Sequence, residues 1–147
     1  MPPKKPLSAP EHHSPQQPCP CGSQESLAHC CLPYINGTRI APTAEALMRS
    51  RYSAHATLAI DYLWQTWHQT ERQGSNRADI RRWAKSCEWL RLEILATQQG
   101  GPDDKEGIVE FIAHFRRAGE LQQHHEISHF TRSPQGWLYL NQRDTLA

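Results

Sequence analysis

The spacing of hydrophobic residues changes from helix-like to strand-like along the chain. After residue 40, apolar side chains recur at every third or fourth position, which is the period of one face of an α-helix. This pattern predicts three short helices, which begin near residues 43, 57 and 79. Thr43 is suited to cap the first of these, which should end near residue 55. Cys87 falls on the apolar face of the third helix, so we expect a small core residue rather than a reactive thiol.

From residue 88 onward, apolar and polar residues alternate, as in strands that face a core on one side. EWLRLEILAT and GIVEFIAHFRR are two such segments, and alternation places Leu90, Leu92 and Ile94 of the first on one face. HHEISHFTR and WLYLN are joined by SPQG, which predicts a hairpin. Three helices followed by about four antiparallel strands indicate an α+β domain over residues 41–142.

Composition limits the rest of the chain. A length of 147 residues with 37% hydrophobic content allows one modest core and a small appended element. Residues 1–17 are rich in proline and poor in large apolar groups, so they should form a disordered tail, with His12 and His13 in solvent. A formal net charge of +1 disfavours a nucleic-acid partner bound through phosphates. We see no apolar run for a signal peptide or membrane span, so we expect a cytoplasmic protein without a membrane partner.

Four of the five cysteines lie in the segment CPCGSQESLAHCC, with the spacing C-x-C-x8-C-C. Disulfides between the pairs would close short, strained loops, and cytoplasmic thiols stay reduced. Thiolates this close in sequence suit a tetrahedral metal site. Four protein ligands would leave no open coordination position, so the metal would have a structural rather than a catalytic role. The expected ligands are Cys19, Cys21, Cys30 and Cys31, with His29 as an alternative fourth ligand. Zinc is the expected ion and iron is possible, because both accept four thiolates.

The cysteine segment resembles the SEC-C metal-binding motif at the C-terminus of the SecA translocation ATPase. The segments LPYINGTRIAPTAEALMRSRYSA and DYLWQTWHQTER are similar to signatures of the YchJ-like bacterial proteins, and the resemblance spans roughly residues 18–142. It implies a SEC-C-type metal knuckle at 18–40, called the knuckle below. For residues 41–142, called the cone domain below, it implies a nuclear transport factor 2-like fold. In that fold a curved sheet wraps a helix and leaves a pocket, the default binding site.

Two polar clusters could line such a pocket. RSRY lies on the first predicted helix, and a second cluster joins the end of the second helix to the later strands. The pocket-lining candidates are Arg49, Arg51, Tyr52, Trp67, His68, Glu110, His125 and Glu126. The alternative for the arginines is a structural ion pair with Glu93 or Glu110. On the third strand, alternation separates His125 and His129 from a second set that contains His124, Glu126 and Ser128, so HHEISH cannot converge as one triad.

These features favour a metal-binding accessory protein. The knuckle would contact a macromolecular partner, with the export or translation machinery suggested by the SecA resemblance, while the pocket would bind a small ligand or a protein. The alternative is a cone-fold enzyme, a hydratase, isomerase or hydrolase, which would use His68 or His125 with Glu110 or Glu126. A histidine and a carboxylate within hydrogen-bond reach inside the pocket would favour the enzyme. An apolar pocket would favour the binding protein. The oligomeric state stays open.

Overall fold

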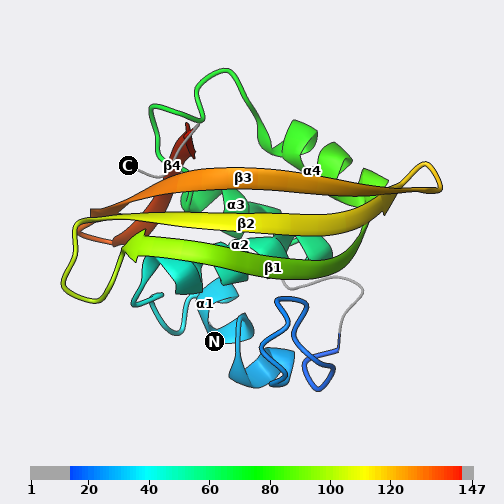
Figure 1. Ribbon diagram of the computed structural model, residues 1–147, viewed down its shortest axis with the longest axis horizontal. Helices are drawn as coiled ribbons and strands as arrows, with labels where there is room; N and C mark the ends of the chain where they lie inside the picture. The colour runs from blue at the N-terminus through cyan, green and yellow to red at the C-terminus, as the bar shows by residue number, and fades with distance from the viewer. Residues whose placement is uncertain (1–13, 144–147) are drawn as a thin grey trace, which may run out of the picture.

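The structure is a computed structural model that describes residues 14–143. Within these residues the chain forms a short 3-10 helix, four α-helices and four strands (Figure 1). The helices are η1 (Leu27–His29), α1 (Leu32–Ile35), α2 (Ala44–Thr57), α3 (Ile60–Gln65) and α4 (Arg77–Ser86). The strands are β1 (Cys87–Gln99), β2 (Glu106–Arg117), β3 (Glu120–Ser133) and β4 (Gly136–Arg143). None of these helices has both the length and the apolar character that crossing a bilayer requires.

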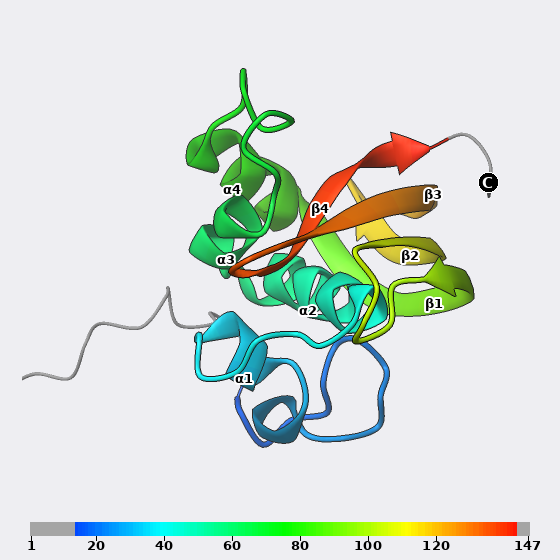
Figure 2. The same ribbon diagram turned by 90° about the vertical axis from the view of Figure 1, so that its left-hand side faces the viewer.

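The strands form one antiparallel sheet in the order β1, β2, β3, β4, so strands adjacent in sequence are adjacent in space. The sheet curves around α2, as Figures 1 and 2 show together. In Figure 2, α3 and α4 lie on one side of α2, and α1 with the rest of the knuckle lies on the other. The predicted α+β architecture is therefore confirmed.

Helix α2 is buried around most of its circumference, because it has the sheet, α3 and the knuckle as neighbours. Thr43 caps its start, as predicted, by accepting a hydrogen bond from the backbone N–H of Ala46 at 3.0 Å. Small hydroxyl residues fill the crowded faces, and Ser50 and Ser53 are fully buried. Leu58 ends the helix in the left-handed conformation, with φ of +59°. This central helix therefore contacts the knuckle, α3 and three of the four strands.

Strand β1 departs from simple alternation at two bulges, between Trp89 and Arg91 and between Ile94 and Ala96. Leu90 is the extra residue of the first bulge and is 43% exposed, while Trp89 turns inward and packs on Phe115 at 5.3 Å between ring centroids. The prediction that Leu90 shares the core face is wrong, because an inserted residue shifts the alternation by one.

The second and third helices differ slightly from the sequence pattern. Helix α3 ends at Gln65, and Trp67 lies beyond it in a bridge to Tyr139 of β4. Helix α4 begins earlier than expected, because Asn76 caps it by accepting the backbone N–H of Asp79 at 2.8 Å. Cys87 is buried, as predicted, although it is the first residue of β1 rather than part of the helix.

The knuckle is not a separate module on a flexible joint. Leu27 and Ile35 belong to the same hydrophobic cluster as the inward residues of α2. The backbone N–H groups of Leu27 and Ala28 also donate to the carbonyls of Gln17 and Pro15. Residues 14–17 therefore join the knuckle rather than the predicted tail. The remainder of that tail, residues 1–13 with both of its histidines, lies outside the described residues.

Candidate metal centre and adjoining cavity

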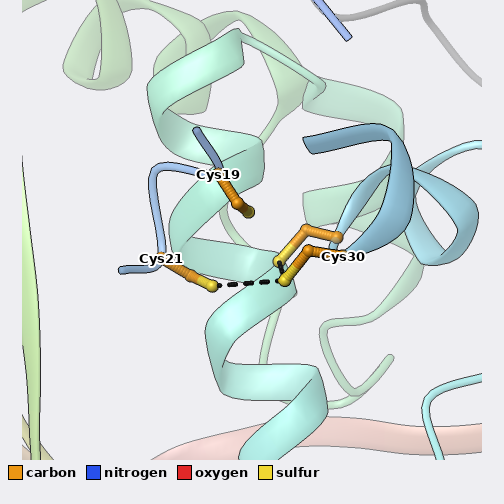
Figure 3. A group of neighbouring side chains, drawn as sticks. Cys19, Cys21 and Cys30 are labelled. Atoms are coloured by element: carbon orange, nitrogen blue, oxygen red, sulfur yellow. Dashed lines mark hydrogen bonds between the residues drawn. The ribbon is translucent and has the colours of Figure 1, made fainter. Parts of the chain in front are cut away.

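The two cysteine pairs come from two facing turns of the knuckle. Gly22, with φ of +82°, allows the chain to turn after C-P-C, and its N–H donates to the carbonyl of Cys19 at 3.1 Å. Cys30 and Cys31 lie at the junction of η1 and α1. Figure 3 shows the side chains of Cys19, Cys21 and Cys30 pointing toward one another beside α2. The turns thus deliver four sulfur atoms to one place.

The distances between these sulfur atoms match a tetrahedral metal site. All four Sγ atoms lie within 4.8 Å of one another, and the Cys21–Cys30 and Cys30–Cys31 pairs are 3.6 and 3.9 Å apart. With zinc–sulfur bonds of about 2.3 Å, the edge of a tetrahedron of sulfurs is about 3.8 Å long. A disulfide would need a separation of about 2.05 Å, and all four thiols are free. The geometry therefore fits a metal ion and not disulfides.

The thiols also perturb one another electrostatically. Hydrogen bonds from Cys19 and Cys31, together with the backbone N–H of Ser23, hold the pKa of the Cys21 thiol far below its usual value. Hydrogen bonding to Cys21 raises the pKa of Cys19 to about 11, and the same network raises that of Cys31 strongly. The four thiols therefore differ in how readily they lose a proton, because thiolates this close together repel one another. A bound divalent cation would remove this repulsion and let all four ligate as thiolates.

Side chains around the sulfurs supply donors suited to thiolates. Ser23 donates to the Cys30 sulfur at 3.0 Å. The hydroxyl of Ser53 lies 3.3 Å from the Cys19 sulfur. Arg49, one turn before Ser53 on α2, donates from Nη1 to the Cys21 carbonyl at 2.9 Å. Helix α2 thus holds one side of the cysteine cluster in place.

His29 does not join this cluster. It is exposed, and its Nδ1 pairs with the hydroxyl of Ser26 at 3.0 Å. Within residues 14–143, the group able to hold a metal consists of the four cysteines alone. The alternative of three thiolates and one imidazole is therefore wrong for this fold.

A cavity of about 450 Å³ lies on the opposite side of α2, between that helix, α3, α4 and the inner face of the sheet. Most of its wall is apolar or aromatic, and includes Met48, Leu63, Trp67, Trp83, Trp89 and Phe111. Its polar groups include Arg51, Tyr52, His55, His124, Glu126 and Tyr139. The combination of an apolar wall with a few convergent polar groups is typical of a small-molecule site.

Glu126 is the central anion of the cavity, and its oxygens are already occupied. His124 donates to Oε1 at 2.8 Å, while the hydroxyls of Tyr139, at 2.8 Å, and Ser128 donate to Oε2. Burial would raise the pKa of Glu126, but these three donors outweigh burial and lower it. The hydrogen bond to Glu126 in turn raises the pKa of His124. The carboxylate is therefore held ionised and fully hydrogen-bonded.

Arg51 and His55 face this anion from α2. Arg51 is 8% exposed, and its Nη1 donates to the Leu63 carbonyl at 2.8 Å and to Thr66 Oγ1 at 2.7 Å. Burial lowers the pKa of Arg51 to about 10, so the guanidinium stays charged near neutral pH. His55 donates from Nδ1 to the Arg51 carbonyl at 2.9 Å. Burial, followed by the charge of Arg51, lowers the pKa of His55 to about 4.

Comparison with known proteins identifies the relatives of this chain. Residues 43–142 match the family model for the middle NTF2-like domain of YchJ. The chain belongs to the YchJ-like family. A UPF0225 protein of Geobacter sulfurreducens is 46% identical over 82% of this chain and 75% of its own length. A second relative, from Streptomyces coelicolor, is 43% identical over 85% of this chain and 94% of its own.

Two solved structures extend the likeness to the knuckle. A SEC-C motif containing protein of Rhodopseudomonas palustris has 36% identity and a TM-score of 0.78, and the match covers 87% of this chain and 98% of that one. A SEC-C motif containing protein of Psychrobacter arcticus has 28% identity and a TM-score of 0.75 over 90% and 86% of the two chains. The cone domain of this YchJ-like chain therefore has the expected NTF2-like fold, and its cysteine cluster is compatible with metal binding.

Half of the eight pocket-lining candidates surround the cavity of this YchJ-like protein. These are Arg51, Tyr52, Trp67 and Glu126. The other four are Arg49, His68, Glu110 and His125, and they lie outside the cavity wall. Arg49 instead contacts the knuckle and Glu45, the latter at 2.9 Å. The alternative of an arginine paired with Glu93 or Glu110 is also wrong, because Arg49 pairs with Glu45 and Arg51 with groups of α3 and the turn after it.

The strand pairing explains why His125 and Glu110 lie elsewhere. Both point to the outer face of the sheet, where His125 donates to Glu110 at 2.6 Å. His68 follows α3 and is half-buried outside the cavity wall, and its Nδ1 accepts the N–H of Thr70 at 3.2 Å. None of the predicted catalytic pairs is therefore brought together inside the cavity.

The sequence reasoning missed His55 and His124. His124 faces inward because it pairs with Ala113 across the sheet, as Glu126 pairs with Phe111. A signal was present, since positions 124, 126 and 128 alternate in step with Phe130, a large apolar residue that is fully buried. His55 lies one helical turn after Arg51, so the helical period alone places both residues on the same face of α2.

Proposed function

We propose that this protein is a zinc-binding accessory protein of the cytoplasm, in which the metal fixes the knuckle against α2 and the cone domain binds a small ligand in its cavity. The observation that carries the metal part is the sulfur geometry, with separations of 3.6 and 3.9 Å against about 3.8 Å for a zinc tetrahedron. Cys19, Cys21 and Cys31 are at most 4% exposed, which supports a closed, structural role without an open coordination position. Iron would occupy the same four thiolates.

The test is metal analysis of the full-length chain purified without chelator. We expect one equivalent of metal, and its loss in the Cys30→Ser/Cys31→Ser variant. The matched control is Cys87→Ser, which removes a cysteine outside the cluster and should retain the metal. Elemental analysis identifies the ion. Reduced wild-type protein that stays empty after refolding in zinc-containing buffer would sink the proposal.

A protein partner for the knuckle is the second part of the proposal. Its support is a small exposed patch formed by Ile40, which is 68% exposed, and Arg39, whose guanidinium lies 5.8 Å from the ring centroid of Tyr34. The SecA resemblance makes the export and translation machineries the first partners to test. Co-sedimentation with purified ribosomes and pull-down with purified SecA, each compared with an Ile40→Asp variant, would test this. Binding that Ile40→Asp leaves unchanged would exclude this patch.

An enzyme is the second candidate, because the cavity does hold a histidine and a carboxylate within hydrogen-bond reach, His124 and Glu126 at 2.8 Å. Three donors already occupy the carboxylate, however, and its lowered pKa makes it a weak base. The apolar wall also favours a binding protein. The test is turnover of a bound ligand, and product formation that Glu126→Gln abolishes would favour the enzyme.

A further inference from the structure

Two polar atoms of the cavity wall have no hydrogen-bond partner among the described residues: the buried hydroxyl of Tyr52, and Nε2 of the half-buried His55. The Nδ1 of His55 faces the Arg51 carbonyl, and because a carbonyl only accepts, Nδ1 must carry the proton. In the neutral imidazole, Nε2 is then a bare acceptor. Burial and the nearby guanidinium keep the ring neutral near pH 7. Within the described residues, Nε2 has no hydrogen-bond partner, whereas Glu126 is occupied by three donors.

The charges around this atom are balanced. The carboxylate of Glu126 is opposed by the charge of Arg51 and by the hydrogen bond from His124. At the wall formed by α4, Asp79 pairs with Arg82. A charged ligand would lose hydration on entering this apolar cavity, and the opposite charges of Arg51 and Glu126 would attract and repel it at once. The cavity therefore favours an uncharged ligand.

The wall of the cavity indicates the shape of that ligand. Trp67, Trp83, Trp89 and Phe111 contribute aromatic rings to the wall. The Trp89 ring lies 5.3 Å from that of His55, and its indole N–H is already donated to the Ala84 carbonyl at 3.2 Å. Offset or edge contacts with such rings suit a planar aromatic molecule. A volume of about 450 Å³ lies near the lower end of the range for small-molecule pockets.

We propose that the cavity binds a neutral, planar aromatic molecule of about two fused rings, whose hydroxyl or N–H group donates a hydrogen bond to Nε2 of His55. The inference rests on the proposed function in one respect only, that the cavity is a ligand site. It goes further by naming the ligand class and the residue that selects its polar group.

The test uses 2-naphthol as the probe, with naphthalene, 2-naphthoate and 2-naphthylmethylammonium as matched controls, in equilibrium dialysis against the full-length, metal-loaded protein. We expect 2-naphthol to bind about tenfold more tightly than naphthalene, which corresponds to one hydrogen bond. Both charged analogues should bind more weakly than 2-naphthol. On the wild-type protein, the ¹⁵N resonance of His55 Nε2 should shift on addition of 2-naphthol and not of naphthalene.

The His55→Phe variant keeps a ring against Trp89 and removes the acceptor, so the tenfold preference should shrink to about twofold or less. His125→Phe makes the same change on the outer face of the sheet and should leave the preference intact. The wild-type probe series and the Nε2 resonance do not depend on how the variants fold.

Each contrary result has a distinct meaning. Equal binding of 2-naphthol and naphthalene, with Nε2 unmoved, overturns the role of His55 and leaves the cavity as a ligand site. A preference for either charged analogue overturns the argument from balanced charge. If no probe binds at concentrations up to about 1 mM, which corresponds to about 4 kcal/mol, the inference fails together with the ligand-binding part of the proposed function. The metal part is decided separately, by metal analysis.

Discussion

Replacing Arg51 by methionine tests whether the buried guanidinium holds the cavity together. The side chain is 8% exposed, and its Nη1 makes two hydrogen bonds, to Leu63 at the end of α3 and to Thr66 just after it. Its guanidinium carbon lies 5.0 Å from the ring centroid of Tyr139, and its charge faces Glu126. Methionine fills similar space with an apolar, flexible chain, so the variant removes the charge and the donors while leaving a packed site.

The expected cost is large for one residue. Hydrogen bonds from a charged group contribute about 1.5–3 kcal/mol each, and the release of a buried charge offsets part of that. Removing the guanidinium also leaves the Leu63 carbonyl and the Thr66 hydroxyl without this donor, and a buried polar group that loses its partner costs about 1–3 kcal/mol. We therefore expect Arg51→Met to lower the free energy of unfolding by about 3–4 kcal/mol. For a domain with a total stability of about 5–15 kcal/mol, this is a substantial fraction.

Urea denaturation of the metal-saturated protein measures this loss, and a double-mutant cycle with Glu126→Gln isolates the charge interaction. Because the charges of Arg51 and Glu126 attract each other, the double variant should lose less stability than the sum of the single losses. A loss below about 1 kcal/mol for Arg51→Met, or strictly additive losses, would refute the argument.

Three further predictions concern individual side chains. The hydroxyl of Tyr52 is the one buried side-chain polar atom without a partner in the described part of the chain, so Tyr52→Phe should leave stability unchanged or raise it by about 1 kcal/mol; a clear loss in urea denaturation would contradict this. The pKa of His55 is lowered to about 4, so its burial costs stability only as the pH falls below about 6.5. The hydrogen bond to Glu126 raises the pKa of His124, so the stability that this bond contributes is lost as the pH rises through the raised pKa of His124. In NMR titration between about pH 8 and pH 6, the His124 ring resonances should therefore move and those of His55 should not. Leu90→Ala should cost less than about 0.5 kcal/mol because Leu90 is the outward residue of a bulge, while Leu92→Ala should cost at least about 1 kcal/mol.

Local patterns were sufficient to predict the elements of this fold. Thr43 could be assigned as a cap because its side chain satisfies a backbone donor that belongs to its own helix. The cysteine cluster could be predicted because both pairs lie within thirteen positions, so little of the chain intervenes. Strict alternation predicted that Val109, Phe111 and Ala113 face inward, because β2 has no bulge within that stretch. In each case the interacting groups are close in sequence.

The cavity depended on information that a single strand or helix does not contain. Alternation separated His124 from His125 correctly, but which of them faces inward is set by the pairing of β3 with β2. The bulge at Leu90 has no signature in hydrophobicity, because leucine suits either face. The partners of Arg51 lie on and just after α3, and the packing of α3 against α2 decides them. These contacts are tertiary, so propensity and periodicity could not supply them.

Helix α2 connects the cysteine cluster to the cavity by simple helical geometry. Arg49 and Ser53 are four residues apart, so they share the face that contacts Cys21 and Cys19. Arg51 and His55 are also four residues apart, but they are offset from the first pair by two residues, or about 200°, and therefore occupy the opposite face. A metal ion that fixes the four sulfurs fixes the knuckle side of α2, and a rigid helix carries that constraint to its other side. If a metal binds there, we expect the position of His55 relative to β3, and with it the width of the cavity, to depend on the cysteine cluster as well as on the sheet.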